Sequence, residues 1–452
     1  MPDAHPEIDD ACCAKLIGGR VRILFLSDNF PPEVNAPASR TFEHCRHWVR
    51  LGHDVTVVTC VPNFPKGEVF PGYRNRIWQS ETMDGVRVIR VWSYITSNEG
   101  FFRRTLDYMS YMVSATLAAL RLPRPDVVIA TSPQFFAACA GYAVSRLKRA
   151  PFVFELRDLW PESIKAVGMM KHRFLLRQLE RLELFLYRKA AGIVAVTESF
   201  RVDLGRRGID TSKIAVVTNG ADLSRFAPRL RDAELSSRFG LDGKFVAGYI
   251  GTHGLAHGLE TILEAASQVR QWPDGDRYRF LLIGDGACKR SLVEEARKRG
   301  LDNIIFVDTV PKEEVPRYWS LLDAAIIHLR KTSLFEGVIP SKLFESMAMG
   351  IPVLHGVPGE SAAIVEREGV GLVFGSEDAE DLARVLRRVS TDGALLQRFR
   401  EACVLAAPKY ERGFLANRML AFVESCAGIA RESRDLAVRS AVTEEGRERA
   451  QS

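Results

Sequence analysis

The stretch VRILFLS, Val21 to Ser27, is dominated by β-branched and other aliphatic residues and shows no alternation of apolar and polar positions. Strands of a parallel sheet are buried on both faces and carry such continuous apolar runs. A loop rich in Pro and Ala follows, then a helical pattern from Arg40 to Arg50, a stop at Gly52 and a second apolar run, DVTVVTC. This order of strand, loop, helix and strand predicts a doubly wound α/β domain.

The same rhythm occurs in two series along the chain. The first continues through GVRVIRV, DVVIA, PFVFEL, AGIVAV and KIAVVTN, and the second begins after Asn219 with KFVAGYIG, YRFLLIGDG, NIIFVDTV, DAAIIHL, IPVLHG and GLVF. A chain of 452 residues is also too long for a single compact core. We therefore expect two Rossmann-like domains in tandem, with a ligand cleft at the carboxyl ends of their strands.

The predicted boundaries follow from these two series. We expect a disordered leader over residues 1–20, a first Rossmann-like domain over 21–222 and a second over 223–404. An amphipathic pattern predicts a helix over 405–430 that returns toward the first domain, and the charged residues 431–452 read as a solvated tail.

The composition is ordinary for a globular protein, with 46% hydrophobic and 26% charged residues. The net charge of +6 fits phosphate-bearing ligands or an anionic membrane surface and does not by itself indicate a nucleic-acid partner. The eight cysteines include no C-x-x-C pair, as expected of reduced thiols in a cytoplasmic protein. TSPQ interrupts the uncharged run from Val127 to Ser145, which predicts a strand and a helix rather than a membrane span.

The stretch LFEGVIPSKLFESMAMGIPVL, residues 334–354, predicts a short apolar helix with ionic residues at its start. Pro340 disfavours helix just before it, the helical pattern runs from Ser341 to Met349, and Gly350 releases the chain into the strand IPVL. The N-terminus of a helix carries unpaired N–H groups and a partial positive charge, so we expect it to attract phosphate.

The ionic residues of this stretch suit a nucleotide sugar. Lys342 adds a full charge at the helix start, and Glu345, one turn later, has two oxygens that could accept both hydroxyls of a ribose. Glu336 in the preceding loop could hold a second sugar. The alternative is that Lys342 and Glu345 form a solvated helix pair without a ligand.

Two glycine-rich turns follow strands of the second series. YIGTHGLAHG contains Gly251, Gly254 and Gly258, which would let the backbone approach a diphosphate to which His253 or His257 could donate. LLIGDG places Gly284 and Gly286 at the tip of another strand. Tight strand-to-helix turns also require glycine, so neither turn is specific alone.

The span from about Val21 to about Ala430 resembles the retaining glycosyltransferases of family 4, which have the two-domain GT-B fold. The matching motifs, in the family's order, are DNFPPEVNAPASR, ELRDLWPESI, VVTNGAD, YIGTHGLAHG, LLIGDG and VIPSKLFESMAMGIPVL. The chain looks closest to the WbuB-like branch, which contains N-acetyl-L-fucosamine transferases of O-antigen and capsule assembly. The resemblance implies an acceptor-side first domain and a second domain that binds a nucleotide sugar, most often of UDP.

The resemblance implies roles for individual residues in the second domain. Glu345 would bind the nucleotide ribose, Glu336 would touch the donor sugar, and Lys342 and Ser341 would meet the diphosphate. The usual pattern spaces its two glutamates eight apart, whereas Glu336 and Glu345 are nine apart and Gly337 occupies the expected first position.

Two other positions depart from the usual family pattern. Thr252 and His257 replace the Arg and Lys that are common in the glycine-rich turn, and Arg157 stands where many members carry His. We expect Lys342 to supply the missing positive charge.

On the acceptor side, two loops follow strands of the first sheet. The resemblance places the loop DNFPPEVNAPASR, with Asn35, near the donor diphosphate. ELRDLWPES brings Arg157, Asp158 and Glu162 to the same edge. We expect Asp158 to orient or deprotonate the acceptor hydroxyl and Arg157 to hold a phosphate, the alternative being an Arg–Asp pair that only fixes the loop.

The resemblance favours front-face attack assisted by the departing diphosphate, with retention of configuration and without a metal or cofactor. The D-G-D at Asp274 to Asp276 is typical of a turn. Two alternatives stay open: a UDP-sugar 2-epimerase of the same architecture and a nucleotide-binding scaffold without catalysis. An NAD enzyme is disfavoured because the first loop lacks G-x-G-x-x-G.

Two further stretches indicate how a lipid-linked acceptor could be reached. FFRRTLDYMSYMVSATLAALRL, residues 101–122, and GMMKHRFLLRQLERLELFLYRK, residues 168–189, combine apolar spacing with basic side chains. Basic amphipathic helices can lie in a membrane interface, although such a stripe can equally be a core face with solvated charges. We expect a cytoplasmic protein in peripheral contact with the membrane that uses a polyprenyl-diphosphate-linked acceptor.

Overall fold

The computed structural model describes residues 19–33, 35–64, 66–96, 101–132, 134–159, 173–332 and 335–428. The predicted tail, most of the predicted leader and Glu162 lie outside the described residues. The chain divides into two compact units. The N-terminal unit contains Met1–Val196, Phe200–Val217 and Ala416–Ser452, and the C-terminal unit contains Thr197–Ser199 and Thr218–Leu415.

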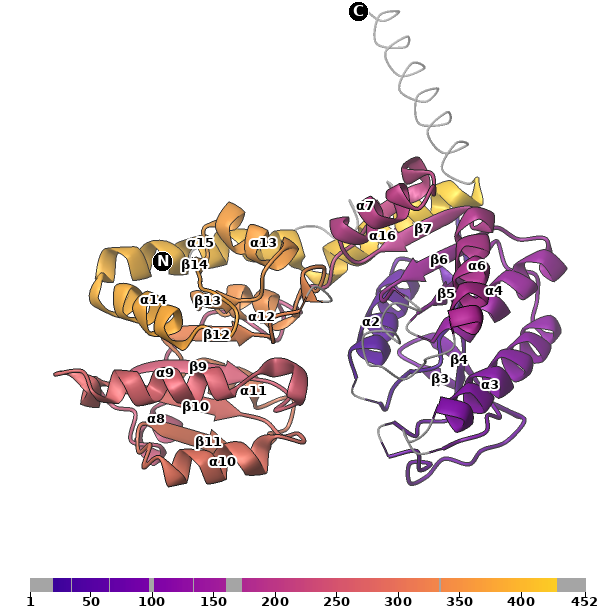
Figure 1. Ribbon diagram of the computed structural model, residues 1–452. Coiled ribbons are helices and arrows are strands. Elements are labelled where there is room, and N and C mark those ends of the chain that lie inside the picture. The colour runs from indigo at the N-terminus through magenta and orange to yellow at the C-terminus, as the bar shows by residue number, and fades with distance from the viewer. Residues whose placement is uncertain are drawn as a thin grey trace, which may run out of the picture. The chain divides into compact units, whose positions relative to one another are not determined.

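The N-terminal unit is built on an eight-stranded sheet in the order β3-β4-β2-β1-β5-β6-β7-β8 (Figure 1). The strands are β1 Arg22–Leu26, β2 Asp54–Cys60, β3 Trp78–Met83, β4 Val86–Val91, β5 Val127–Thr131, β6 Phe152–Leu156, β7 Gly192–Ala195 and β8 Ile214–Val216. All neighbours pair in parallel except β3, which runs antiparallel to β4 at the edge. Because β3 is half-exposed and short of apolar residues, no apolar run predicted it.

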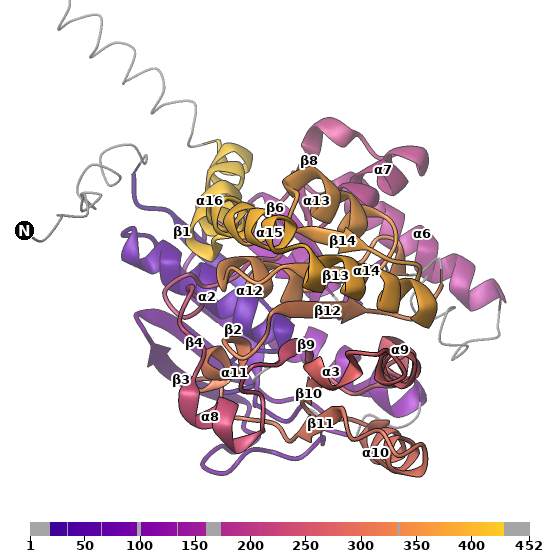
Figure 2. The same cartoon turned by 90° about the vertical axis from the view of Figure 1, so that its left-hand side faces the viewer.

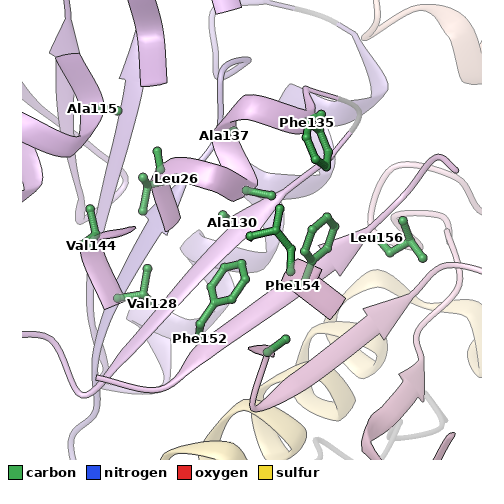
Figure 3. Packing of buried hydrophobic residues seen from close by; sticks show 14 of the residues in the cluster. Leu26, Ala115, Val128, Ala130, Phe135, Ala137, Val144, Phe152, Phe154 and Leu156 are labelled. Carbon is green, nitrogen blue, oxygen red and sulfur yellow. The ribbon is translucent and has the colours of Figure 1, made fainter. Parts of the chain in front are cut away.

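Helices cover both faces of this sheet. They are α2 Ala36–Arg50, α3 Phe101–Arg121, α4 Phe135–Lys148, α6 Arg173–Lys189, α7 Glu198–Arg206 and α16 Arg412–Ala427, the last two of which cross between the units. Successive side chains of a strand point to opposite faces, so Leu24 and Leu26 pack with α3 and α4 while Phe25 contacts Trp48 of α2. Figure 3 shows the core on the α3 and α4 side.

The start of α2 precedes the predicted Arg40. Asn35 is the N-cap, and its side-chain oxygen accepts from the backbone N–H of Ala38 at 2.9 Å. Pro37 lies in the first turn, where its fixed φ suits a helix and its missing N–H costs nothing. The helix therefore begins at Ala36, within the loop that was predicted to be irregular.

The C-terminal unit contains a six-stranded, fully parallel sheet in the order β11-β10-β9-β12-β13-β14 (Figures 1 and 2). The strands are β9 Phe245–Ile250, β10 Tyr278–Ile283, β11 Ile304–Val307, β12 Ala324–His328, β13 Val353–Gly356 and β14 Gly371–Val373. The helices are α8 Ala233–Arg238, α9 Glu260–Arg270, α10 Lys289–Lys298, α11 Val315–Trp319, α12 Lys342–Ala348, α13 Glu360–Glu368, α14 Ala379–Thr391 and α15 Gly393–Ala406. The prediction of two Rossmann-like α/β sheets is confirmed.

The end of the chain returns to the N-terminal unit through α16. Near the start of α16, a β-bridge joins Ala221 to Glu411, and both residues belong to the C-terminal unit. The main segment of that unit begins at Thr218, whereas the sequence placed the domain boundary at 223. Further along, the carbonyl of Ala416 accepts from the indole Nε1 of Trp48 at 2.9 Å. Within the predicted helix over 405–430, the structure has one helix, α16, over Arg412–Ala427, which starts later than predicted because α15 ends at Ala406 and a 3-10 turn lies between the two.

Candidate functional site

A cavity of about 260 Å³ lies within the C-terminal unit where β9 and β12 end. It is lined by Tyr249, Ile250, Gly251, Thr252, His257, Trp319, Ile326, Ile327, His328, Leu329, Val338, Pro340, Ser341 and Lys342. Five of these residues belong to the predicted site: Gly251, Thr252, His257, Ser341 and Lys342. The structure thus brings the first glycine-rich turn and the start of α12 to one hollow, at the strand ends where doubly wound sheets bind ligands.

The ion pair of α12 is buried at its Glu345 end, whereas the side chain of Lys342 is 35% exposed. Lys342 Nζ donates to Glu345 Oε2 at 3.0 Å, and Glu345 is only 7% exposed. Every residue from Leu343 to Ala348 is buried, so this helix lies inside the unit on all sides. Lys342 supplies the cation that this buried carboxylate requires, since burying an unpaired charge is costly.

The start of α12 offers backbone donors to the cavity. The N–H groups of Leu343 and Phe344 are taken by the carbonyls of Pro340 and Ser341, whereas no described residue accepts from those of Ser341 and Lys342. At the other end, Gly350 has φ +69 and the N–H of the following residue donates to Ser346, which confirms the predicted stop.

The glycines of the second turn, predicted to bind the donor, permit close backbone packing. A Cβ on Gly284 would lie 1.9 Å from the carbonyl oxygen of Gly251, and one on Gly286 would lie 2.6 Å from that of His253. The N–H of Gly251 donates to Ile283, at the end of the neighbouring strand. Gly284 and Gly286 therefore allow the two turns to pack backbone to backbone, and neither lines the cavity.

The two candidate histidines lie in different surroundings. His253 is fully buried between the rings of Tyr249 and Phe306, and burial lowers its pKa to about 4, so it is neutral and does not line the cavity. His257 lines the cavity, burial lowers its pKa too, and no described group bonds to its Nδ1. Of the two, His257 is the one placed to donate to a ligand.

Glu336 lies in an exposed turn and is not among the cavity-lining residues. Its backbone oxygen accepts from the N–H of Glu360 at 3.1 Å, and a Cβ on Gly359 would come within 2.1 Å of that oxygen. Its backbone thus anchors the start of α13, while the carboxylate has no described contact.

In the N-terminal unit, one hydroxyl holds the loop after β6. Ser132 Oγ accepts from the backbone N–H of Arg157 at 2.8 Å and from that of Asp158 at 3.3 Å. This bridge from the end of β5 fixes both candidate residues at the carboxyl edge of the sheet. The sequence signal was TSPQ, in which a polar residue directly follows an apolar strand.

A buried ionic cluster lies beneath this loop, and sequence reasoning missed it. Arg40 Nε donates to Glu155 Oε1 at 2.9 Å, and both side chains are almost fully buried. Burial opposes ionisation of Glu155, but the charges of Arg40 and Arg157 outweigh it and hold its pKa below the usual value. Burial lowers the pKa of Arg157 to about 10, against the favourable charge of Glu155. The charge of Arg157 is therefore coupled to that of Glu155.

A second group of acids occupies the edge beside β1. Tyr111 Oη and the N–H of Ser27 both donate to the carbonyl of Val58, near the end of β2. Asp28 follows Ser27 directly, and Asp107 lies one helical turn before Tyr111 on α3, so both carboxyl groups belong to this strand end. Burial raises the pKa of Asp107 to about 7 and that of Asp28 well above its usual range. Strongly shifted carboxyl groups at a strand edge are typical of binding sites.

Two remaining candidates have structural partners. Asn35 Nδ2 donates to Asn29 Oδ1 at 2.7 Å while its Oδ1 caps α2, so both ends of the amide are engaged. Asp274 starts a 3-10 turn and forms an ion pair with Arg387, as expected of a turn residue.

Comparison with known proteins identifies the two units. A family model described as glycosyl transferase 4-like domain matches residues 35–220, and one described as glycosyl transferases group 1 matches residues 233–403. Together these matches cover most of the chain.

Relatives along most of the chain carry corresponding names. WcaI of Escherichia coli K12, named as a glycosyl transferase of colanic acid biosynthesis, is 25% identical over 73% of this chain and 82% of its own length. A GDP-mannose-dependent alpha-mannosyltransferase of Mycobacterium tuberculosis is 25% identical over 78% of this chain and 84% of its own.

Solved structures share the fold of this chain. Anabaena HepE, in a crystal with UDP, aligns with a TM-score of 0.65 at 15% identity over 89% of this chain and all of its own. WaaG, a glycosyltransferase involved in lipopolysaccharide biosynthesis, aligns with a TM-score of 0.62 at 14% identity over 89% of this chain and 99% of its own. At these identities the likeness establishes the fold.

Proposed function

This chain belongs to the family 4 glycosyltransferases of the GT-B fold, and from that premise we propose that it transfers a sugar from a nucleotide diphosphate to a lipid-linked saccharide in bacterial polysaccharide assembly. The observation that carries the proposal is the cavity that brings the first glycine-rich turn together with Ser341 and Lys342, whose ammonium donates to the buried Glu345 behind the lining. Relatives named for colanic acid and teichuronic acid biosynthesis support the polysaccharide role.

The donor in this proposal is a UDP sugar, which the UDP complexes of HepE support. Lys342 and the N–H groups at the start of α12 bind the diphosphate, with His257 and Thr252 lining the same cavity. Glu345 accepts from the ribose hydroxyls. The transferred sugar is an N-acetylated aminosugar such as N-acetyl-L-fucosamine, as the resemblance to the WbuB-like branch implies.

The chemistry proposed is retaining and independent of metal or cofactor. The bond between the anomeric carbon and the diphosphate oxygen breaks, and the acceptor oxygen bonds to the same face of that carbon. The proton of the acceptor hydroxyl passes to the departing diphosphate. Asp158 orients that hydroxyl, and Arg157 holds a phosphate of the acceptor or the donor. Glu336 would have to reach the donor sugar from its exposed turn.

A lipid-linked acceptor requires contact with a membrane surface, and α3 carries a fitting stripe. Its exposed apolar residues recur at helical spacing: Leu106, Met109, Val113, Leu117 and Leu120, each 39–53% exposed. On α6, Phe174 is 73% exposed beside basic residues. No described helix is long and apolar enough to span a membrane. We therefore propose peripheral binding at the cytoplasmic face.

The membrane proposal is tested with liposomes that contain anionic lipid. Val113→Asp with Leu117→Asp should abolish co-sedimentation of the full chain, because each charge would enter the interface. Leu405→Asp, at a 77% exposed position of the other unit, is the matched control. Equal binding by wild type and the double variant would contradict the proposal.

Turnover assays test the transfer itself. The full chain is incubated with UDP, GDP and dTDP sugars, with and without a polyprenyl-diphosphate-linked saccharide and with EDTA, and the anomeric configuration of the product is read by NMR. We expect turnover of a UDP sugar that requires the acceptor, resists EDTA and retains configuration. A 2-epimerase would act without an acceptor, and a scaffold would turn over none of the donors.

A further inference from the structure

The turn that carries His257 is held at three consecutive carbonyl groups. Arg330 Nε donates to the carbonyl of Leu255 at 2.6 Å, and the backbone N–H of Arg330 donates to that of Ala256 at 2.9 Å. His328 Nδ1 lies 2.7 Å from the carbonyl oxygen of His257. All three bonds come from the end of β12, so the turn is attached along its whole length to the neighbouring strand.

The hydrogen bonds of His328 determine its protonation. Its Nε2 accepts from the backbone N–H of Glu377 at 2.9 Å, so the proton of the neutral ring must sit on Nδ1, where it donates to His257. The ring is 1% exposed and stacks on Phe374 at 6°. His328 therefore joins two loops, the turn 254–258 and the segment after β14, through one fixed imidazole.

Glu377 completes this arrangement from the segment after β14. Its Oε2 accepts from the N–H of Lys331 at 2.8 Å, and its Oε1 pairs with Arg330 Nη1 at 3.2 Å. It has φ +60, in the left-handed region that L residues other than Asn and Asp rarely adopt. Such a conformation persists where the surroundings over-determine it, and these contacts do so.

The turn fits against this cluster without spare room. A Cβ on Gly258 would lie 3.0 Å from His328 Cε1 and 3.1 Å from Arg330 Cγ, at φ +54. On its other side the turn presents His257 to the cavity, beside Thr252. The cluster thus fixes one wall of the cavity: His328 is part of that wall, and Arg330 and Glu377 support it from behind.

We infer that His328, Arg330 and Glu377 are positioning residues that hold the turn 254–258 ready for the diphosphate of the donor. The role in donor binding rests on the proposed function, whereas the restraint of the turn does not. A wall that is already ordered saves the entropy of ordering it when the ligand binds. These residues therefore raise donor affinity, although Arg330 and Glu377 do not line the cavity.

Glu377→Gly separates positioning from folding. Glycine adopts φ +60 without strain, so the backbone of the variant is relieved while the side-chain contacts to Arg330 and Lys331 are lost. Arg149→Gly is the matched control, because Arg149 has φ +54 in the N-terminal unit. Hydrogen exchange over residues 252–259 and calorimetric titration with UDP are measured on the full chain.

We expect Glu377→Gly to keep the thermal midpoint near that of wild type, to speed amide exchange in the turn and to weaken UDP binding about tenfold. Arg149→Gly should change neither the exchange in the turn nor the UDP affinity. Unchanged exchange in Glu377→Gly would overturn the restraint. Faster exchange with unchanged UDP affinity would overturn the positioning role. Failure of wild type to bind UDP would instead count against the proposed donor, and the exchange experiment would still decide the restraint.

Substitutions of His328 give a second measurement. The amide of His328→Asn can still donate to the carbonyl of His257, whereas His328→Leu fills similar space without a donor. UDP affinity should therefore fall less for the Asn variant than for the Leu variant. Equal losses would show that His328 acts through packing alone and would contradict the inference.

Discussion

Lys342 and Glu345 can be replaced separately or together, and the three variants compared with wild type distinguish a ligand site from a structural ion pair. Their side chains are 35% and 9% exposed, and the contact is 3.0 Å long. Lys342→Met leaves a nearly buried carboxylate without its cation. Glu345→Gln leaves an ammonium that still reaches water, and the double variant removes both charges.

The magnitudes follow from these exposures. Breaking a fully buried pair costs about 3–5 kcal/mol, but the partly exposed lysine lowers this to about 2 kcal/mol for Lys342→Met. Glu345→Gln should cost about 1 kcal/mol, and the double variant about the same, because no unpaired charge is then buried. Nucleotide binding should behave otherwise. Each single change loses a hydrogen bond to a charged group, about 1.5–3 kcal/mol or roughly 10- to 100-fold in UDP affinity.

The assay measures urea unfolding and calorimetric UDP titration for wild type and the three variants. Lys409 and Glu368 provide the control pair, because they form a 2.6 Å contact in the same unit and neither lines the cavity. Lys409→Met should lower stability slightly and leave the UDP affinity unchanged. The double variant of Lys342 and Glu345 should regain stability but not UDP binding.

Two results would refute this reasoning. Wild-type UDP affinity in either single variant would remove the pair from the donor site. Recovery of UDP affinity together with stability in the double variant would show that the pair only maintains the fold of α12.

Three further predictions concern the surroundings of the site. Gly284→Ala should destabilise the C-terminal unit by about 3 kcal/mol or more in urea unfolding, because its Cβ would collide with the backbone of the neighbouring turn. The control Gly243→Ala, at φ +68 with open space around the new Cβ, should cost about 1 kcal/mol. Equal losses of stability would contradict the packing argument. Burial raises the pKa of Asp107 to about 7, so the stability that its neutral form provides is fully present below about pH 4 and is lost as the pH rises toward 7. Asp107→Asn should therefore raise the unfolding free energy at pH 8 by up to about 4 kcal/mol and leave it unchanged at pH 4. An effect that does not depend on pH would refute this. Ser132→Ala should release the loop after β6, because the hydroxyl that accepts from Arg157 and Asp158 is lost. The rate of sugar transfer should then fall by a larger factor than the UDP affinity. Equal factors for rate and affinity would argue against an acceptor role for that loop.

Local sequence determined the secondary structure and the fold class of this protein. Continuous apolar runs such as VRILFLS and DAAIIHL became strands because strands buried on both faces of a parallel sheet need apolar residues at every position. Gly350 ended α12 because glycine tolerates φ +69. The start of α12, from its helix N-terminus and Lys342, and the first glycine turn, from its position after a strand, were both predicted to meet a diphosphate, and they line one cavity.

Only the tertiary structure decided which side chains meet. Gly284 faces Gly251 because β9 and β10 are neighbours in the sheet, and sequence spacing does not encode that order. His328 and Glu377 are far from His257 along the chain, yet together they hold its turn. Burial also depends on the whole core: the sequence left open whether Glu345 was a ribose ligand or half of a solvated pair, and its side chain lies inside the unit. Periodicity reports what each residue prefers, whereas the contacts and pKa values of a site arise from neighbours that sheet order brings together.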